Sequence, residues 1–258
     1  MEIFDTEGAL VRRFSSADPS PNAYPKNLPI AMEWVREAAP LSADAGMHRF
    51  VWDLRYELPK SVHKSFYGPA GVWALPGNYT VKLTANGKSS SQTLGVKMDP
   101  RISTSEDGLR REFVAASRVS ARLGDVAAAQ GRAEELQKQI AARKTEAAGN
   151  AEIAAALAEL AHKIDEVHGA PGEEEFGFFG LRLPGAEPST LHKVAAALTG
   201  LLMIVDGADA APTADAQTAT EKWEAAGADV LARWKAVEAS IVIMNVVLEK
   251  AKLKPLPR

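Results

Sequence analysis

Two carboxylates, Asp53 and Glu57, stand where a predicted strand meets a long connection. A pair of carboxylates can carry out glycoside hydrolysis, one as general acid and the other as nucleophile or base. His63 lies a few residues further on, in the same long connection. We therefore take Asp53, Glu57 and His63 as the candidate catalytic residues. The sequence does not give the separation of the two carboxylates, on which such chemistry depends.

Aromatic residues in three long connections are the candidate ligand-binding residues. Long loops often carry the binding sites of a β-sandwich. The alternative is that these aromatics only anchor ordered loops to the core. The candidates are Trp34 in the connection 15–45, Tyr67 and Trp73 in the connection 57–73, and Phe176, Phe178 and Phe179 beside an acidic run in the loop 169–187.

Metal-binding patterns are weak in this chain. It has no cysteine, which excludes disulfides, thiolate catalysis and cysteine-based zinc sites. His162 and Glu166 lie one helical turn apart and could offer two metal ligands, but such pairs are common by chance. Carboxylates in the β-loops could bind calcium, although no EF-hand-like spacing supports it. We predict no metal site and no cofactor, with calcium left open.

Composition and motifs exclude several classes of function. The sequence has no Gly-x-Ser-x-Gly elbow, no His-Glu-x-x-His, no Walker loop and no Gly-x-Gly-x-x-Gly. Its net charge of −3, from 30 basic and 33 acidic residues, predicts no nucleic-acid or membrane partner. The longest apolar run, about 198–205, is too short to span a bilayer. The first residues lack a secretory signal, so the chain as given is expected in the cytoplasm.

Alternating side chains predict five strands, and the turns between them support the assignment. Asn86-Gly87 favours a type I′ hairpin, because both central residues of that turn need a positive φ. In the central strand, His48 is expected as a hydrogen-bonded core residue, with Phe50, Trp52 and Leu54 on the same inner face. The strands span roughly 2–5, 9–14, 47–54, 78–86 and 89–98.

The strand motifs resemble a known domain. The turn at 5–8, Leu10-Val-Arg-Arg-Phe14, Phe50-Val-Trp-Asp53 and Pro76-Gly-Asn-Tyr79 together resemble the immunoglobulin-like domain of the flagellar hook-capping type. The longer pattern through Val96-Lys-Met-Asp-Pro-Arg101 resembles the C-terminal region of large bacterial proteins built on sortilin-like β-propellers with BNR repeats. Those proteins are commonly labelled glycosyl hydrolases. The resemblance implies a longer, periplasmic or secreted parent protein.

Such a sandwich usually needs about seven strands, so five predict an incomplete sandwich with an exposed edge. An unpaired edge favours self-association by strand addition or pairing with a protein partner. After residue 101, apolar stripes at helical spacing predict four helices packed as an antiparallel bundle. Their predicted limits are Ser103, Thr104 or Ser105 to about Ala147, Asn150 to Gly169, Pro188-Ser189 to Gly207, and Pro212-Thr213 to about Lys252.

The predicted fold class is α+β in two segregated parts. Residues 1–101 form the incomplete immunoglobulin-like antiparallel β-sandwich with two long loop insertions, and residues 102–258 form the bundle of about four helices. The leading hypothesis is a non-catalytic accessory region that binds a ligand or partner within a larger exported propeller-type protein. The alternatives are a small hydrolase of glycosidic, ester or lactone bonds, with or without calcium, and an inert fragment of a longer gene. A hydrolase requires titratable groups that converge where the loops around Asp53 and His63 meet the helices.

Overall fold

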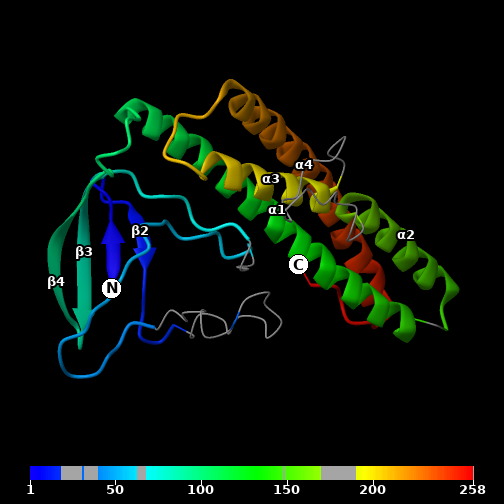
Figure 1. The fold of residues 1–258 in the computed structure, drawn as a ribbon. Coiled ribbons are helices and arrows are strands. Elements are labelled where there is room, and N and C mark those ends of the chain that lie inside the picture. Colours follow the sequence, from blue (N-terminus) through cyan, green and yellow to red (C-terminus); the bar gives the residue numbers. More distant parts are fainter. Residues whose placement is uncertain (19–30, 32–39, 63–67, 148, 170–189, 258) are drawn as a thin grey trace.

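The computed structural model describes residues 1–18, 31, 40–62, 68–147, 149–169 and 190–257 (Figure 1). These residues form an α+β architecture in which four strands precede four helices, so the predicted class is confirmed. Figure 1 shows the sheet at one end of the helices, beside the start of α1. The elements are β1 (Glu2–Phe4), β2 (Leu10–Arg13), β3 (Gly77–Ala85), β4 (Lys88–Val96), α1 (Glu106–Glu146), α2 (Ala151–His168), α3 (Leu191–Val205) and α4 (Ala214–Lys250).

The described strands form one antiparallel sheet in the order β2-β1-β3-β4. β3 and β4 pair along their full length, from Gly77 opposite Val96 to Ala85 opposite Lys88. The hairpin between them has a φ of 50° at one central residue, Asn86, and of 74° at the glycine that follows. This confirms the predicted turn, since both residues occupy the left-handed region that a type I′ turn requires. β2 and β4 are the two edges of the sheet.

The predicted strand over 47–54 is wrong. This segment contains no strand in the structure, and its pairing is limited to an isolated antiparallel bridge between Arg55 and Trp73. Leu54 has a φ of 57°, which ends the extended backbone because a strand cannot continue through the left-handed region. His48 is exposed and contacts the backbone carbonyl of Asp44 at 2.9 Å, so it is not the core histidine that the alternation predicted.

Of the four side chains that the alternation places on the inner face, Phe50 and Trp52 do contact aromatic residues of the sheet part, whereas His48 and Leu54 are exposed. The Phe50 ring meets that of Phe14 edge-on at 4.6 Å, and the Trp52 ring meets that of Tyr79 at 5.4 Å. Such edge-to-face aromatic pairs are favourable beyond the area that they bury. The segment therefore covers the sheet with its aromatic rings without pairing to it as a strand.

All four helices begin at predicted or neighbouring caps. The side chains of Ser105, Asn150, Thr190 and Thr213 each accept a hydrogen bond from a backbone N–H in the first turn. These bonds satisfy N–H groups that have no partner within the helix. The third helix begins at Leu191 rather than Pro188-Ser189, which lie outside the described residues.

The helices pack around one large apolar cluster, and α1 contacts each of the other three. The residues on the predicted stripes are buried, apart from Phe113, which is partly exposed. Among the described residues, no helix combines the length and apolar character that a bilayer crossing needs. The largest fully buried side chains of this cluster are Leu123, Leu136, Ile140, Leu157, Ile164, Leu191, Leu198, Leu202, Leu248 and Leu256.

The connection between β2 and β3 joins the sheet to the helices. Ser61 donates a hydrogen bond of 2.6 Å to the backbone carbonyl of Gly124 on α1. A Cβ at Gly124 would lie 2.7 Å from the Cβ of Pro59, so only glycine permits this close approach. Val62 and Val72 pack into the helical cluster. The sheet therefore reaches the helices through this connection.

Candidate functional site

A cavity of about 330 Å³ lies where the sheet meets the helices, and we call it the junction cavity. Its walls come from three places: the segments on either side of β3 and β4, the first turns of α1, and the loop that follows α3. Aromatic and carboxyl side chains both line it, which is the mixed character of ligand sites. The residues used below are Trp73, Lys97, Asp99, Glu112, Phe113, Asp206 and Asp209.

Arg55 and Asp206 form the ion pair that fixes one wall of the cavity. Arg55 Nη1 donates to Asp206 Oδ2 at 2.6 Å, and the backbone N–H of Trp73 donates to Asp206 Oδ1 at 3.1 Å. The Arg55 guanidinium also lies 3.7 Å from the centroid of the Trp73 ring, in a cation–π contact. Asp206 therefore binds two residues of the β2–β3 connection from its position at the C-cap of α3.

Backbone pairing holds these two residues side by side. The N–H of Tyr56 donates to the carbonyl of Val72 at 2.8 Å, and that of Ala74 donates to Leu54 at 2.8 Å. A Cβ at Gly71 would lie 1.8 Å from the Tyr56 carbonyl oxygen, so this pairing requires glycine. These two backbone hydrogen bonds orient the Arg55–Asp206 ion pair, although neither segment forms a full strand here.

Glu112 is the most strongly perturbed carboxyl group of the cavity. It is 5% exposed on the first turns of α1. Burial, together with the charges of Asp206 and Asp209, raises the pKa of Glu112 to about 7. A hydrogen bond from the Ala210 backbone acts in the opposite direction and lowers this pKa. Burial also raises the pKa of Asp206, opposed by its bonds to Arg55 and Trp73. Near neutral pH, Glu112 can therefore either donate or accept a proton.

The structure places Asp53 and Glu57 on one arginine and outside the cavity lining. Arg12 Nη1 lies 3.7 Å from Asp53 Oδ2, and Arg12 Nε lies 3.5 Å from Glu57 Oε2. About half of each carboxylate side chain is exposed. Both groups therefore neutralise Arg12, whose guanidinium also donates to the Tyr56 carbonyl at 3.0 Å.

Among the predicted ligand-binding residues, Trp73 lies on the cavity wall and is 40% exposed. The catalytic candidate His63 lies outside the described residues. So do the other ligand-binding candidates, namely Trp34, Tyr67, Phe176, Phe178 and Phe179. Among the described residues, the structure thus brings one predicted binding residue to the cavity.

Glu112 and Asp206 were not among the predicted site residues, although the sequence carries a signal for each. Glu112 interrupts the apolar stripe of α1, three residues after Leu109 and four before Ala116, so helical geometry turns it toward the core. Asp206 directly follows the apolar run of α3 and precedes Gly207. A charged residue at a buried helical position requires a partner or a shifted pKa, and both occur here.

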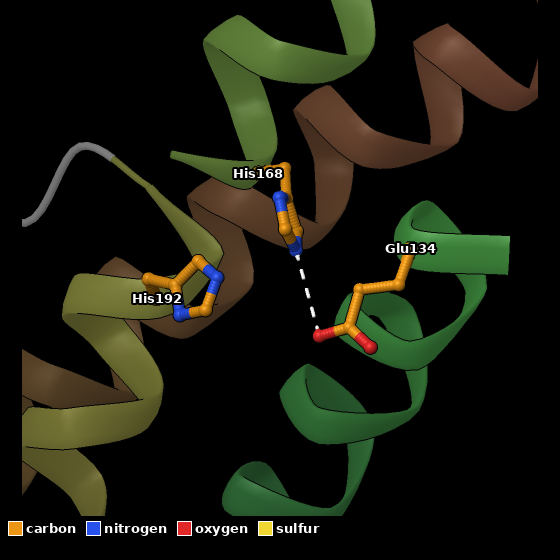
Figure 2. Close-up of side chains that lie close together, drawn as sticks. All are labelled: Glu134, His168 and His192. Carbon is orange, nitrogen blue, oxygen red and sulfur yellow. Dashed lines mark ion pairs between the residues drawn. The ribbon is translucent and has the colours of Figure 1, made fainter. Parts of the chain in front are cut away.

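A second cluster of titratable groups lies among the helices (Figure 2). Glu134 of α1, His168 at the end of α2 and His192 at the start of α3 bring their ligand atoms within 4.8 Å of one another. His168 Nε2 lies 3.9 Å from Glu134 Oε1. No metal site was predicted at these residues. The weak histidine pattern of the sequence was His162 with Glu166, which are exposed and lie 3.6 Å apart from Nδ1 to Oε1.

Comparison of the chain with protein-family models, with curated proteins and with solved structures finds no match. The resemblance to propeller-associated regions therefore remains a prediction. The geometry of the junction cavity carries the functional inference. That cavity joins aromatic surface and perturbed carboxyl groups, and therefore suits both binding and acid–base chemistry.

Proposed function

We propose that this chain is a non-catalytic binding region and that its ligand occupies the junction cavity. The observation that carries the proposal is the cavity of about 330 Å³, built jointly by the sheet connection and the helices. Its volume falls at the lower end of the range for small-molecule sites, which suits one or two sugar rings. The Arg55–Asp206 ion pair and the backbone pairing at Gly71 hold the cavity wall in place before a ligand binds. Binding therefore loses little conformational entropy in the protein.

The lining indicates a neutral, hydroxyl-rich ligand. Of the carboxyl groups in the lining, Asp206 is paired with Arg55 and Asp99 with Arg101, so the cavity carries little net charge and favours a neutral ligand. Carboxylates accept hydrogen bonds, and the ligand must therefore supply donors. Trp73 and Phe113 add aromatic surface for apolar contact. A carbohydrate has both properties, and the resemblance to proteins labelled glycosyl hydrolases points the same way.

The test is a binding screen of the purified chain against mono- and oligosaccharides, followed by calorimetry on the best ligand. We expect Trp73→Ala to weaken binding about 10-fold or more, because about 1.4 kcal/mol corresponds to one decade. Asp209→Asn should also weaken binding, since Asp209 lines the cavity. The matched control is Asp53→Asn, which changes a carboxylate outside the lining. Equal affinity in all variants would contradict the proposal, as would binding of cations or anions in place of sugars.

A second candidate function, glycoside hydrolysis, is favoured by the raised pKa of Glu112 in the same cavity as Asp206. A carboxyl group with a pKa near 7 suits a general acid, while the second carboxylate can act as nucleophile or base. Turnover of chromogenic glycosides, short esters or acyl lactones would support it if Glu112→Gln abolishes the activity. The rate should then fall as the pH rises through about 7, because the acid form is lost. Activity that remains in Glu112→Gln would contradict this candidate function. A parallel assay with a chelator tests whether the activity needs calcium.

The wider assignment is also a proposal: an incomplete immunoglobulin-like sandwich followed by an antiparallel helical bundle, within a larger exported propeller-type protein. The exposed edge strand β4, whose residues are solvent-exposed up to Gly95, supports pairing with another chain or a second copy. Light scattering should then show a dimer that Leu94→Lys dissociates. A monomer at all concentrations would contradict self-association through this edge. If the chain neither binds sugars nor turns over any of the substrates, the inert-fragment interpretation is favoured.

A further inference from the structure

We propose that Glu134, His168 and His192 form a binding site for a divalent transition metal, with Zn²⁺ as its ion. Two imidazoles and one carboxylate are a ligand set that zinc uses, with the fourth position left to water. The three side chains come from three different helices and point toward one another (Figure 2). A bound ion would therefore tie α1, α2 and α3 together away from the junction cavity.

The first argument is a buried nitrogen without a partner. His168 is 4% exposed, and its Nε2 has no hydrogen-bond partner. Nε2 lies 3.9 Å from Glu134 Oε1, a distance too long for a hydrogen bond. A neutral imidazole nitrogen is a ligand that divalent transition metals accept. A metal ion between the two atoms would satisfy both.

The second argument is that the backbone fixes both histidines. Gly169 has a φ of 80°, and a Cβ there would lie 2.5 Å from Thr190 Oγ1. Only glycine therefore allows the end of α2 to approach the N-cap of α3 this closely. The consequence is that His168 and His192 face each other, with ring centroids 4.5 Å apart. The chain thereby presents two imidazoles from different helices at one place.

The geometry needs only a small contraction to hold an ion. Metal–ligand bonds of about 2.0–2.1 Å in a tetrahedron place ligand atoms about 3.3 Å apart. Here the ligand atoms lie within 4.8 Å, and half of the Glu134 side chain is exposed and can move inward. The side-chain amide nitrogen of Gln130 lies 2.9 Å from His192 Nδ1 and 3.4 Å from its Nε2. With its oxygen turned to Nδ1, the amide can orient the imidazole as outer partners of metal ligands do.

The test is titration of the metal-stripped full chain with Zn²⁺ by calorimetry, and with Co²⁺ by visible absorption. We expect one ion per chain and the intense d–d bands of tetrahedral Co²⁺. Glu134→Gln, an isosteric change at a half-exposed position, should keep the fold and weaken affinity about 100-fold or more. His168→Ala and His192→Ala should abolish the Co²⁺ bands. Circular dichroism of each variant confirms that the helices remain.

His162→Ala is the matched control, because it removes an exposed histidine from the same helix as His168. It should bind both metals as the unmodified chain does. Loss of binding in His162→Ala with retention in His168→Ala would overturn the proposal. So would full affinity in Glu134→Gln, or the octahedral spectrum of Co²⁺ held mainly by water.

Discussion

The helical part and the sheet part of this molecule differ in how they are stabilised. The helices share a large apolar cluster that draws on all four of them. Among the described residues, the apolar cluster of the sheet has three buried members, Ile3, Val11 and Tyr79, and its other contacts come from partly buried residues such as Trp52. A core this small is marginal by itself, because burial scales with the size of the domain. The sheet therefore depends on the helices, and the junction cavity lies where the two parts meet.

The largest expected effect comes from the helical core. Leu198→Ala removes a fully buried side chain and should lower the free energy of unfolding by about 2–5 kcal/mol. Because the sheet depends on the helices, both should unfold together in a urea titration followed by far-ultraviolet circular dichroism and tryptophan fluorescence. Ile3→Ala is the matched change in the sheet and should leave the helical signal in place. A sheet that stays folded at urea concentrations where the helices are unfolded would contradict its dependence on them.

The contact between the two parts gives the next effect. Asp206→Ala leaves Arg55 without its partner and should cost about 3 kcal/mol, at the lower limit for buried pairs because Arg55 is partly exposed. Hydrogen exchange should speed up in β3 and β4 more than in α2. The control is Glu224→Ala, which breaks a pair whose arginine, Arg118, is largely exposed, and it should cost under about 1 kcal/mol. Equal effects of the two changes would contradict the assigned role of Asp206.

The pH dependence of stability sharpens the comparison further. The folded-state pKa of Glu112 is raised to about 7, so the folded chain holds a proton that the unfolded chain releases at lower pH. Stability from this group is present at low pH and is lost as the pH rises through about 7. The loss between about pH 5 and pH 7 should be about 2 kcal/mol. Glu112→Gln should flatten this slope, whereas Glu106→Gln, exposed on the same helix, should keep it.

The smallest effect is expected in the segment 47–54. Met47 and Val51 are exposed, so Met47→Ser and Val51→Thr should change stability by less than about 0.5 kcal/mol. Amide hydrogens from Met47 to Asp53 should exchange quickly, since the described structure pairs none of them in a strand. Strong protection of these amides from hydrogen exchange would instead support the strand that the alternation predicted.

The difference between the helical part and the sheet part also explains which elements the sequence could predict. Helix limits follow from local rules, namely an apolar stripe, a capping side chain and a terminating residue, so all four helices were predicted closely. A strand needs a partner that may lie far along the chain, and alternation alone cannot show that the partner exists. The segment 47–54 has the alternation, but the left-handed φ of Leu54 ends it, and no strand of the described residues pairs with it.

The sites were harder to predict because they join distant residues. Arg55 meets Asp206, and His168 meets Glu134, only because helices pack in a particular order. The carboxylates taken as catalytic candidates, Asp53 and Glu57, bind Arg12 and do not line the junction cavity. Glu112 could have been found as a charged residue within an apolar stripe.

The central claim is that the sheet and the helices together build one ligand site. The most direct measurement is chemical-shift mapping of the isotope-labelled chain during a titration with the best sugar from the screen. We predict the largest changes at the Trp73 indole N–H, the Glu112 carboxyl carbon and the amides around Asp206, which come from both parts of the molecule. Changes confined to one part, or none in the junction cavity, would contradict the account.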